Sequence, residues 1–194
     1  MRESSTTRAA IFIDRDGTIN KDTGYVSRPD ELIIYPYAAE AVRLVNESGL
    51  KAIVITNQSG VARGLYTEET LAAIHDRMTR ELAREGARID AIYYCPHHPE
   101  IGDEPYRRAC ECRKPGPGML RQAAREHGID LARSYVIGDK ASDMNLATGA
   151  GAQGVMVLTG YGRETIANRE RWYCEPVIIA DNLLEAVKLI LDRS

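Results

Sequence analysis

Short apolar runs alternate with helical patterns along almost the whole chain, and this alternation limits the possible fold more than any other feature. The runs carry little polar alternation, which is typical of strands covered on both faces of a parallel sheet. Repeated strand–helix–strand order implies right-handed crossovers and therefore a doubly wound α/β sheet. The expected strands are Ala10–Asp14, Ala52–Thr56, Ala91–Tyr94, Tyr135–Gly138, Gly154–Leu158 and Val177–Ile179.

Capping residues predict where two of the helices begin or end. Thr67 followed by Glu68 is a favourable N-cap and first turn, and Gly86 provides a C-terminal stop. Near the end of the chain, Asn182 with Glu185 resembles a capping box. These signals place helices between the strands, where a doubly wound fold requires them.

Length and composition predict a single domain over residues 1–194, large enough to bury a core. Apolar residues make up 44% and charged residues 27%, which is ordinary for a globular protein. The formal net charge of −3 offers no general basic field for nucleic acid, and no apolar run is long enough to span a membrane. Because Met1–Arg8 lacks the apolar stretch of a signal peptide, we expect a cytoplasmic protein. The lack of an obvious apolar association helix predicts a monomer.

Two irregular segments interrupt the alternation. Residues 19–36 contain Gly24, Pro29 and Pro36 and are expected to form a turn and a small hairpin, a flap beside the first strand. Residues 95–112 belong to a loop rich in Pro, Gly and Cys, whose length is typical of functional or metal-stapled loops. Neither segment is long enough for a cap domain, so we expect an open, capless site.

The first expected strand runs directly into two acids, in the sequence Asp14-Arg15-Asp16-Gly17-Thr18. Open α/β sheets bind their ligands at the carboxyl ends of the strands. There, one carboxylate can act as nucleophile and metal ligand while the other moves protons. Gly17 lets the chain turn tightly, and Thr18 leaves a hydroxyl beside the acids. A calcium loop would need further oxygen ligands at alternate positions, which Ile19-Asn20-Lys21 does not supply.

Polar groups also follow the second and fourth strands. Thr56-Asn57-Gln58-Ser59-Gly60 ends the second strand, and Gly138-Asp139-Lys140, with Asp143 just beyond, ends the fourth. Since parallel strand ends gather at one edge of the sheet, we expect these groups to meet Asp14 and Asp16 there. One such ending is usually a turn or a helix cap. Three of them, with the lysine of Arg113-Lys114-Pro115, indicate a catalytic site.

These motifs resemble those of the haloacid dehalogenase-like (HAD) phosphohydrolases, and the resemblance covers essentially the whole chain. The four HAD motifs correspond to Asp14–Thr18, Thr56, Lys114, and Gly138-Asp139 with Asp143. Within that superfamily the sequence is similar to the D-glycero-D-manno-heptose 1,7-bisphosphate 7-phosphatases, cytoplasmic bacterial enzymes of heptose supply for lipopolysaccharide or other surface glycans. That similarity lies in Asp22-Thr23-Gly24-Tyr25-Val26, Thr56–Gly60, Cys95-Pro96-His97-His98-Pro99 and Cys112-Arg113-Lys114-Pro115.

The resemblance implies a Mg²⁺-dependent phosphomonoester hydrolase that acts through an aspartyl phosphate. The substrate it implies is a small sugar bisphosphate, a precursor of ADP- or GDP-heptose. The implied catalytic residues are Asp14 as nucleophile, Asp16 as general acid and base, and Thr56, Arg113 and Lys114 as contacts to the phosphate and transition state. The implied substrate contacts are Asp22, Thr23, Gly24, Tyr25, Thr56, Asn57, Gln58, Ser59, Arg113, Lys114 and Lys140.

By the same resemblance, Asp14, Asp139 and the backbone carbonyl of Asp16 would hold the Mg²⁺. These hard oxygen ligands suit an ion that keeps several waters and that offsets the repulsion between an anionic nucleophile and a phosphate. Asp143 is expected to orient the site without ligating the metal.

A Cys₃His set stands at the two ends of the irregular loop, formed by Cys95, His97, Cys110 and Cys112. In a cytoplasmic protein such residues indicate thiols or metal ligands before disulfides. Thiolate and imidazole suit tetrahedral Zn²⁺, and four protein ligands leave no open position, so the site would be structural. By spacing alone His98 is a rival to His97. Cys174 is left over as an ordinary small side chain, and His75 and His127, in helical stretches, are expected at the surface.

Three other enzyme activities and one non-catalytic role are alternatives to a heptose bisphosphate phosphatase. The nearest is a histidinol-phosphate phosphatase, which shares the first motif and the zinc loop. The acidic balance disfavours a polynucleotide phosphatase, and the lack of a water-excluding cap disfavours a phosphomutase. The intact pair Asp14 and Asp16 argues against a non-catalytic zinc-stabilised binding module. The sequence leaves the anomer at the first sugar carbon open, and with it the choice of heptose pathway.

The order of residues after Cys112 generates one prediction. Arg113 and Lys114 follow that expected zinc ligand directly, so zinc should fix the position of the third-motif cation without taking part in the chemistry. We expect Cys110→Ser to lower both turnover and thermal stability, measured as kcat and Tm. A variant that is folded at the assay temperature, free of zinc and fully active would contradict this coupling.

Overall fold

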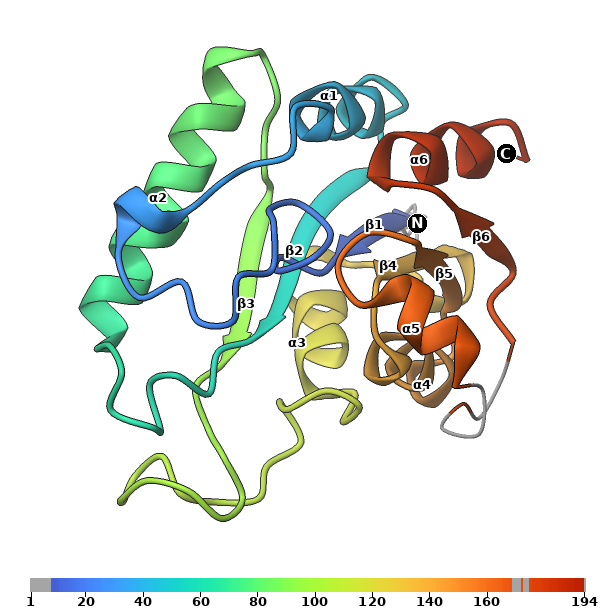
Figure 1. Cartoon of the computed structure of the whole chain (residues 1–194). Coiled ribbons are helices and arrows are strands. Elements are labelled where there is room, and N and C mark those ends of the chain that lie inside the picture. Colours follow the sequence, from blue (N-terminus) through green and yellow to red (C-terminus); the bar gives the residue numbers. More distant parts are fainter. Residues whose placement is uncertain (1–7, 169–171, 173–174, 194) are drawn as a thin grey trace, which may run out of the picture.

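The computed structural model describes residues 8–168, 172 and 175–193, and its strands form one six-stranded sheet in the order β3-β2-β1-β4-β5-β6 (Figure 1). Every neighbouring pair is parallel. The strands are β1 (Ala10–Ile13), β2 (Lys51–Asn57), β3 (Ala91–Cys95), β4 (Tyr135–Gly138), β5 (Gln153–Val157) and β6 (Ile178–Ala180). The doubly wound sheet and its expected strands are confirmed, with strand ends shifted by no more than about one residue.

Helices cover both faces of the sheet (Figure 1). Residues of α1, α2 and α6 pack in one apolar cluster, and residues of α3 and α4 pack in another on the opposite face. Side chains of β1 alternate between the two clusters: Ile11 and Ile13 join the first, and Phe12 joins the second. The helices are α1 (Ala38–Glu47), α2 (Glu68–Arg84), α3 (Gly118–His127), α4 (Ala141–Ala150), α5 (Gly162–Ala167) and α6 (Leu183–Leu191), with 3₁₀ turns η1 (Pro29–Glu31) and η2 (Leu131–Arg133).

The expected helix caps are present, with one change. Thr67 caps α2 by accepting from the backbone N–H of Thr70, and Gly86 follows the helix with φ +81°. Asn182 caps α6 by accepting from the N–H of Glu185. The Glu185 carboxylate, however, accepts from the N–H of Asp181 at 2.5 Å rather than from that of Asn182, so the reciprocal half of the capping box is displaced by one residue.

The order of the strands reverses between β1 and β4. The chain runs from β1 outward through β2 to β3, and then returns to β4 on the other side of β1. In open sheets a ligand crevice forms outside the carboxyl ends of the strands at such a reversal. Asp14 directly follows β1 and Asp139 directly follows β4, so the topology delivers both acids to this crevice.

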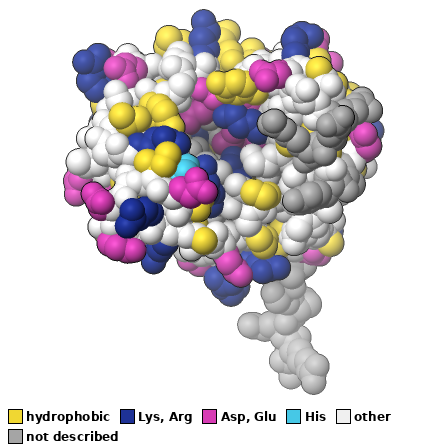
Figure 2. Space-filling model, turned by 60° about the horizontal axis from the view of Figure 1, so that its bottom comes forward, with side chains coloured by type: hydrophobic (Ala, Val, Ile, Leu, Met, Phe, Trp, Pro, Cys, Tyr) yellow, Lys and Arg dark blue, Asp and Glu magenta, His cyan; other side chains and the backbone are white. Residues whose placement is uncertain are grey.

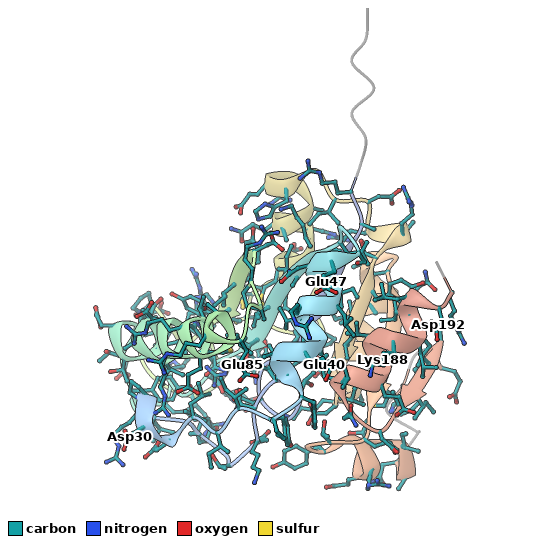
Figure 3. All side chains as sticks on the ribbon, turned by 90° about the horizontal axis from the view of Figure 1, so that it is seen from above. Asp30, Glu40, Glu47, Glu85, Lys188 and Asp192 are labelled. Carbon is teal, nitrogen blue, oxygen red and sulfur yellow. The ribbon has the colours of Figure 1, made fainter. Side chains whose placement is uncertain are left out.

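The chain between β1 and β2 contains η1 and α1 and no cap domain. Residues 19–36 form a loop closed by an antiparallel bridge between Asn20 and Ile34, which agrees with the expected turn and small hairpin. The helix that follows, α1, lies beside α6, and Figure 3 shows Glu40 and Lys188 on this pair of helices. Lys188 Nζ and Glu40 Oε1 form an ion pair with a separation of 3.5 Å. In the described residues no helix has the length and apolar character needed to cross a membrane.

Candidate active site

Lys114 lies at the centre of the crevice, in contact with two buried acids. Its Nζ is 2.7 Å from Asp14 Oδ1 and 2.7 Å from Asp143 Oδ1, and it also donates to the Ile55 carbonyl at 3.3 Å. Burial opposes the charged form of Lys114, but the two carboxylates outweigh it and raise the pKa of the ammonium. Lys114 is therefore a permanent cation at the ends of β1 and β4.

The backbone of Lys114 is fixed by an amide side chain from the end of β2. Asn57 accepts from the Lys114 N–H at 3.0 Å and donates to its carbonyl at 3.2 Å. Thr56, one residue earlier, is 1% exposed, and its Oγ1 accepts from Gln58 at 2.8 Å. The second-strand motif thus holds the lysine and presents a hydroxyl next to it.

Asp139 completes a group of three acids with Asp14 and Asp143, whose candidate ligand atoms all lie within 4.8 Å of one another. Its Oδ2 accepts from the Tyr161 N–H at 2.8 Å. Its Oδ1 is buried and has no hydrogen-bond partner in the described part of the chain. A buried carboxylate oxygen without a partner is costly, which indicates that this atom is reserved for a ligand.

Two glycines make room for the Asp139 carboxylate. A Cβ on Gly17 would lie 2.2 Å from Asp139 Oδ2, and a Cβ on Gly160 would lie 2.1 Å from it. Gly17 also has φ +90°, a conformation that L side chains rarely adopt. These positions require glycine, because a side chain at either would push the acid out of the cluster.

Burial and mutual repulsion disfavour the ionised forms of Asp14 and Asp139, and Lys114 offsets this only in part. Burial raises the pKa of Asp14, and the neighbouring Asp143 charge adds to this, although Lys114 opposes it. Burial and the Asp14 charge likewise raise the pKa of Asp139 well above its usual range. The pKa of Asp14 rises to about 6 and that of Asp139 to about 8, so of the two only Asp139 mainly keeps its proton at neutral pH, and a bound cation would replace that proton.

Asp16 has a different environment from the other acids. Its carboxylate accepts from Arg15 Nη2 at 2.7 and 2.8 Å, from Asn20 Nδ2 at 3.0 Å and from Gln58 Nε2 at 2.9 Å. Burial alone would raise the pKa of Asp16, but the Arg15 charge and these hydrogen bonds outweigh burial and lower it. Its side chain is outside the Asp14, Asp139 and Asp143 group, as expected for a residue that would offer a metal only its backbone carbonyl.

A cleft of about 460 Å³ opens in front of these residues, and Figure 2 looks toward a hollow where basic and acidic side chains gather. Asp22 closes one side by pairing with Lys140 Nζ at 2.9 Å, and Arg113 donates to the His97 carbonyl at 3.1 Å.

Two of the expected contacts do not line this cleft. Thr56 lines a smaller adjoining cavity with Asp14, and Thr23 is exposed on the flap. The expected contacts that line the cleft are Asp22, Gly24, Tyr25, Asn57, Gln58, Ser59, Arg113, Lys114 and Lys140.

The oxygen donors fit Mg²⁺, an ion that prefers carboxylate and carbonyl ligands. Among the residues that the structure describes, none forms a hydrogen bond with Asp139 Oδ1. Both oxygens of Asp143 are engaged, Oδ1 by Lys114 and Oδ2 by the Lys140 N–H at 3.1 Å. Asp139 Oδ1 is thus available to a metal, whereas Asp143 is engaged by Lys114 and by the Lys140 N–H. The assignment of Asp14 and Asp139 as the metal ligands stays a prediction.

Cys95, His97, Cys110 and Cys112 form a second cluster beside the cleft. The Sγ–Sγ distances are 3.1, 3.4 and 3.5 Å, and His97 Nδ1 lies 3.2 Å from Cys112 Sγ. Ligands at zinc-bond length around a tetrahedral centre are separated by about 3.4–3.8 Å. Two of these four separations fall in that range, and the other two, at 3.1 and 3.2 Å, are shorter by a few tenths of an ångström. The convergence of three thiols and one imidazole is of the kind that suits zinc. His98 is turned elsewhere: its Nδ1 accepts from the N–H groups of Glu100 and Ile101. Of the two rivals, His97 is therefore the one in the cluster.

Several residues of the site were not anticipated. Arg15 and Tyr66 line the cleft, and Tyr66 donates to Gln58 Oε1 at 2.7 Å. His75 was expected at the surface, which is wrong: it is only 6% exposed, because it lies four residues after Leu71 on the core face of α2 and contacts Arg15. That spacing was the available signal. His127 is partly buried against Tyr93, and Cys174 lies outside the described residues.

The switch-point crevice, the acids at its strand ends and the central lysine define a HAD-like phosphohydrolase. A family model described as HAD-hydrolase-like matches residues 111–186. A crystal structure of D,D-heptose 1,7-bisphosphate phosphatase from B. bronchiseptica, complexed with magnesium and phosphate, superposes with a TM-score of 0.86 at 38% identity. The match covers 96% of this chain and 99% of that one.

Curated relatives agree with this class. The chain is 47% identical over 154 residues to the D-glycero-beta-D-manno-heptose-1,7-bisphosphate 7-phosphatase of Rhodopseudomonas palustris, covering 79% of this chain and 86% of the relative. It is 41% identical over 187 residues to the D-glycero-D-manno-heptose-1,7-bisphosphate 7-phosphatase of Thermosynechococcus vestitus, covering 94% and 95%. The chain belongs to the heptose-1,7-bisphosphate 7-phosphatase family of HAD-like phosphomonoesterases.

The close approach of Gly17 and Gly160 to the Asp139 carboxylate generates a prediction. We expect Gly17→Ala to lower kcat by about a hundredfold, because its Cβ would displace the Asp139 carboxylate by an ångström or more. Gly149→Ala is the matched control: Gly149 lies in α4, and no atom would be within 4 Å of its Cβ. It should keep wild-type kcat and gain about 0.5–1 kcal/mol of stability in urea denaturation. An equal loss of kcat in both variants would contradict the requirement for glycine beside Asp139.

The raised pKa values of Asp14 and Asp139 predict how Mg²⁺ stabilises the protein at different pH. The folded protein holds protons that the unfolded chain releases above about pH 4, so metal-free stability should fall as pH rises through the raised pKa values. Since Mg²⁺ competes with those protons, its stabilising effect should grow in the same direction.

Melting temperatures in magnesium-free buffer and in saturating Mg²⁺, at about pH 5 and pH 8, measure this effect. The increase in Tm caused by Mg²⁺ should be larger at the higher pH, and Asp139→Asn should remove most of the difference. Chelators are avoided because they would also remove any metal bound by the Cys and His cluster. An increase in Tm that is equal at both pH values, or larger at the lower one, would contradict competition between Mg²⁺ and these protons.

Proposed function

We propose that this phosphomonoesterase removes the 7-phosphate of D-glycero-D-manno-heptose 1,7-bisphosphate in the synthesis of nucleotide-heptose precursors. The observation that carries the proposal is the meeting of Asp14, Asp139 and Lys114 at one point of the sheet edge. A nucleophile, a candidate metal ligand and a fixed cation around one small cavity match the needs of a transferring phosphoryl group. The names of the relatives supply the sugar.

In the first step the Asp14 carboxylate attacks phosphorus, and the bond from phosphorus to the sugar oxygen breaks. Asp16 gives its proton to that oxygen, so the sugar leaves as a neutral alcohol and an aspartyl phosphate remains. Lys114 and Thr56 hold the phosphoryl oxygens. The charge of Lys114 becomes more valuable as negative charge builds up on them.

In the second step Asp16, now ionised, takes a proton from a water molecule that attacks the same phosphorus atom. The acyl phosphate bond breaks, inorganic phosphate leaves and Asp14 is regenerated. Arg15, Asn20 and Gln58 stabilise the ionised form of Asp16 that this step requires. In the first step the incoming phosphate dianion favours the protonated form, because like charges repel.

Asp14, Asp139 and the Asp16 backbone carbonyl would hold Mg²⁺, which supplies positive charge that offsets repulsion between the nucleophile and the phosphate. Cys95, His97, Cys110 and Cys112 would hold a structural zinc. The Arg113 contact with the His97 carbonyl would then make the zinc loop part of the cleft wall. We further assign Arg113 and Lys140 to the distal part of the substrate, since guanidinium and ammonium groups suit a second phosphate. The flap residues Asp22–Tyr25 would contact the sugar.

A phosphate-release panel tests the proposal. It compares both anomers of the heptose 1,7-bisphosphate with histidinol phosphate, each with and without Mg²⁺. We expect magnesium-dependent release from a heptose bisphosphate and little from histidinol phosphate. The preferred anomer then assigns the pathway. Faster turnover of histidinol phosphate would replace the proposed function with the alternative activity.

Asp14→Asn is the control for the chemistry. It removes the nucleophile in a nearly isosteric way, so phosphate release should fall to background while the protein stays folded by circular dichroism. Release that persists in Asp14→Asn would rule out an aspartyl phosphate on this residue. The cytoplasmic location, the monomeric state and the single-domain organisation expected from the sequence stay predictions.

A further inference from the structure

Arg15, between the two acids of the first motif, is completely buried, and it is the largest of the fully buried side chains in the described residues. Its guanidinium grips the Asp16 carboxylate with three contacts, from Nε at 3.0 Å and from Nη2 at 2.8 and 2.7 Å. A planar guanidinium fixes both the position and the plane of the carboxylate it binds in this way. Arg15 therefore decides where the Asp16 oxygens point.

The third guanidinium nitrogen of Arg15, Nη1, contacts His75 of α2, which is 60 positions further along the chain. Arg15 Nη1 lies 3.2 Å from His75 Nε2. Because a guanidinium can only donate, His75 Nε2 must present its lone pair, which fixes the ring as the neutral tautomer with its proton on Nδ1. Burial and the Arg15 charge also hold the pKa of His75 down to about 3, in agreement with a neutral ring.

We propose that His75 is a positioning residue that, through Arg15, sets the orientation of the Asp16 carboxylate for proton transfer to the leaving sugar oxygen. The inference rests on the proposed function, in which Asp16 is the proton donor. His75 itself is in α2, on the far side of Arg15 from Asp16, and touches no reacting atom.

The physical reason is the cost of an unsatisfied donor. Without an acceptor at residue 75, one N–H of a buried guanidinium would lose its partner, and the group would shift or recruit water to recover it. Asp16 would move with it, because three of its contacts come from the same guanidinium. General acid catalysis depends on reach and alignment, so a small shift weakens proton transfer without removing the acid.

The opposite side of Asp16 is held by separate contacts, which limits how far it can move. Asn20 donates to Oδ1, and Gln58 donates to Oδ2 in an orientation fixed by the Tyr66 hydroxyl. The loss of His75 should therefore misalign Asp16 rather than free it. The expected defect is partial and smaller than that of Asp16→Asn.

The test uses leaving groups of different basicity. An alkyl phosphate needs a proton as its oxygen departs, whereas a dinitrophenyl phosphate does not, and kcat/KM reports only the steps up to that departure. We expect His75→Leu to lower kcat/KM by about tenfold for sugar and simple alkyl phosphates and by less than about twofold for dinitrophenyl phosphate. His75→Gln, whose amide oxygen can accept from Arg15, should recover most of the loss.

Tyr94→Phe is the matched control. Tyr94 packs its ring against His75 and donates its hydroxyl to Glu68, so the variant perturbs the same neighbourhood without touching Arg15. It should leave kcat/KM within about twofold for every ester. A loss in His75→Leu that is uniform across the esters, or is shared by Tyr94→Phe, would mean that His75 only fills space, and would overturn the inference.

Asp16→Asn distinguishes a failure of the positioning role of His75 from a failure of the proposed function. If Asp16→Asn also affects alkyl and aryl esters equally, the proton-donor role of Asp16 fails, and the proposed mechanism fails with it. If Asp16→Asn is selective for alkyl esters and His75→Leu is not, only the positioning role fails. Should His75→Leu not fold, His75→Phe puts the same question, because it keeps a ring against Tyr94 and removes the acceptor for Arg15. It should show the same selectivity for basic leaving groups, and equal effects on all esters would overturn the inference.

Discussion

Three buried carboxylates, Asp14, Asp139 and Asp143, lie around one lysine, and the rest of the structure depends on keeping them together. Like charges in a poorly solvated site repel strongly, and their separation from water carries a further cost. Lys114 offsets part of that cost with two contacts of 2.7 Å. The repulsion that Lys114 leaves unbalanced, together with an Asp139 Oδ1 that has no hydrogen-bond partner within the described part of the chain, favours the binding of a divalent cation here.

The fold provides the rigidity that such a concentration of charge needs. Asp14 and Asp139 extend from β1 and β4, adjacent strands whose backbone pairing fixes the distance between them. Asn57, from the end of β2, grips the Lys114 backbone on both sides of the residue. Gly17 and Gly160 allow the chain to approach Asp139 as closely as it does. Catalytic geometry is thus built mainly on the sheet, while the loops complete it.

The cleft has no cap domain, so recognition must come from short segments that are tied to the core. The flap is joined to the end of β4 by the Asp22–Lys140 pair, and the Cys and His cluster is joined to the cleft by Arg113, which donates to the His97 carbonyl. Both contacts involve residues that line the cleft, and the Asp22–Lys140 pair joins segments 118 positions apart in the sequence. An open cleft with such fixed walls suits a small polar substrate that carries charge at two points.

The sequence by itself determined the sheet and the acids at its strand ends, because local apolar periodicity and strand-end motifs carry that information. It also singled out the three cysteines and a histidine that the structure gathers in one cluster, whereas the roles of the acids came from the family resemblance. It also gave Lys114 as the cation of the site. It could not decide between His97 and His98, since ring orientation depends on the loop fold, and it missed Arg15, Tyr66 and the buried His75. Those residues matter through partners as much as 60 positions away, and only tertiary packing determines which donor meets which acceptor.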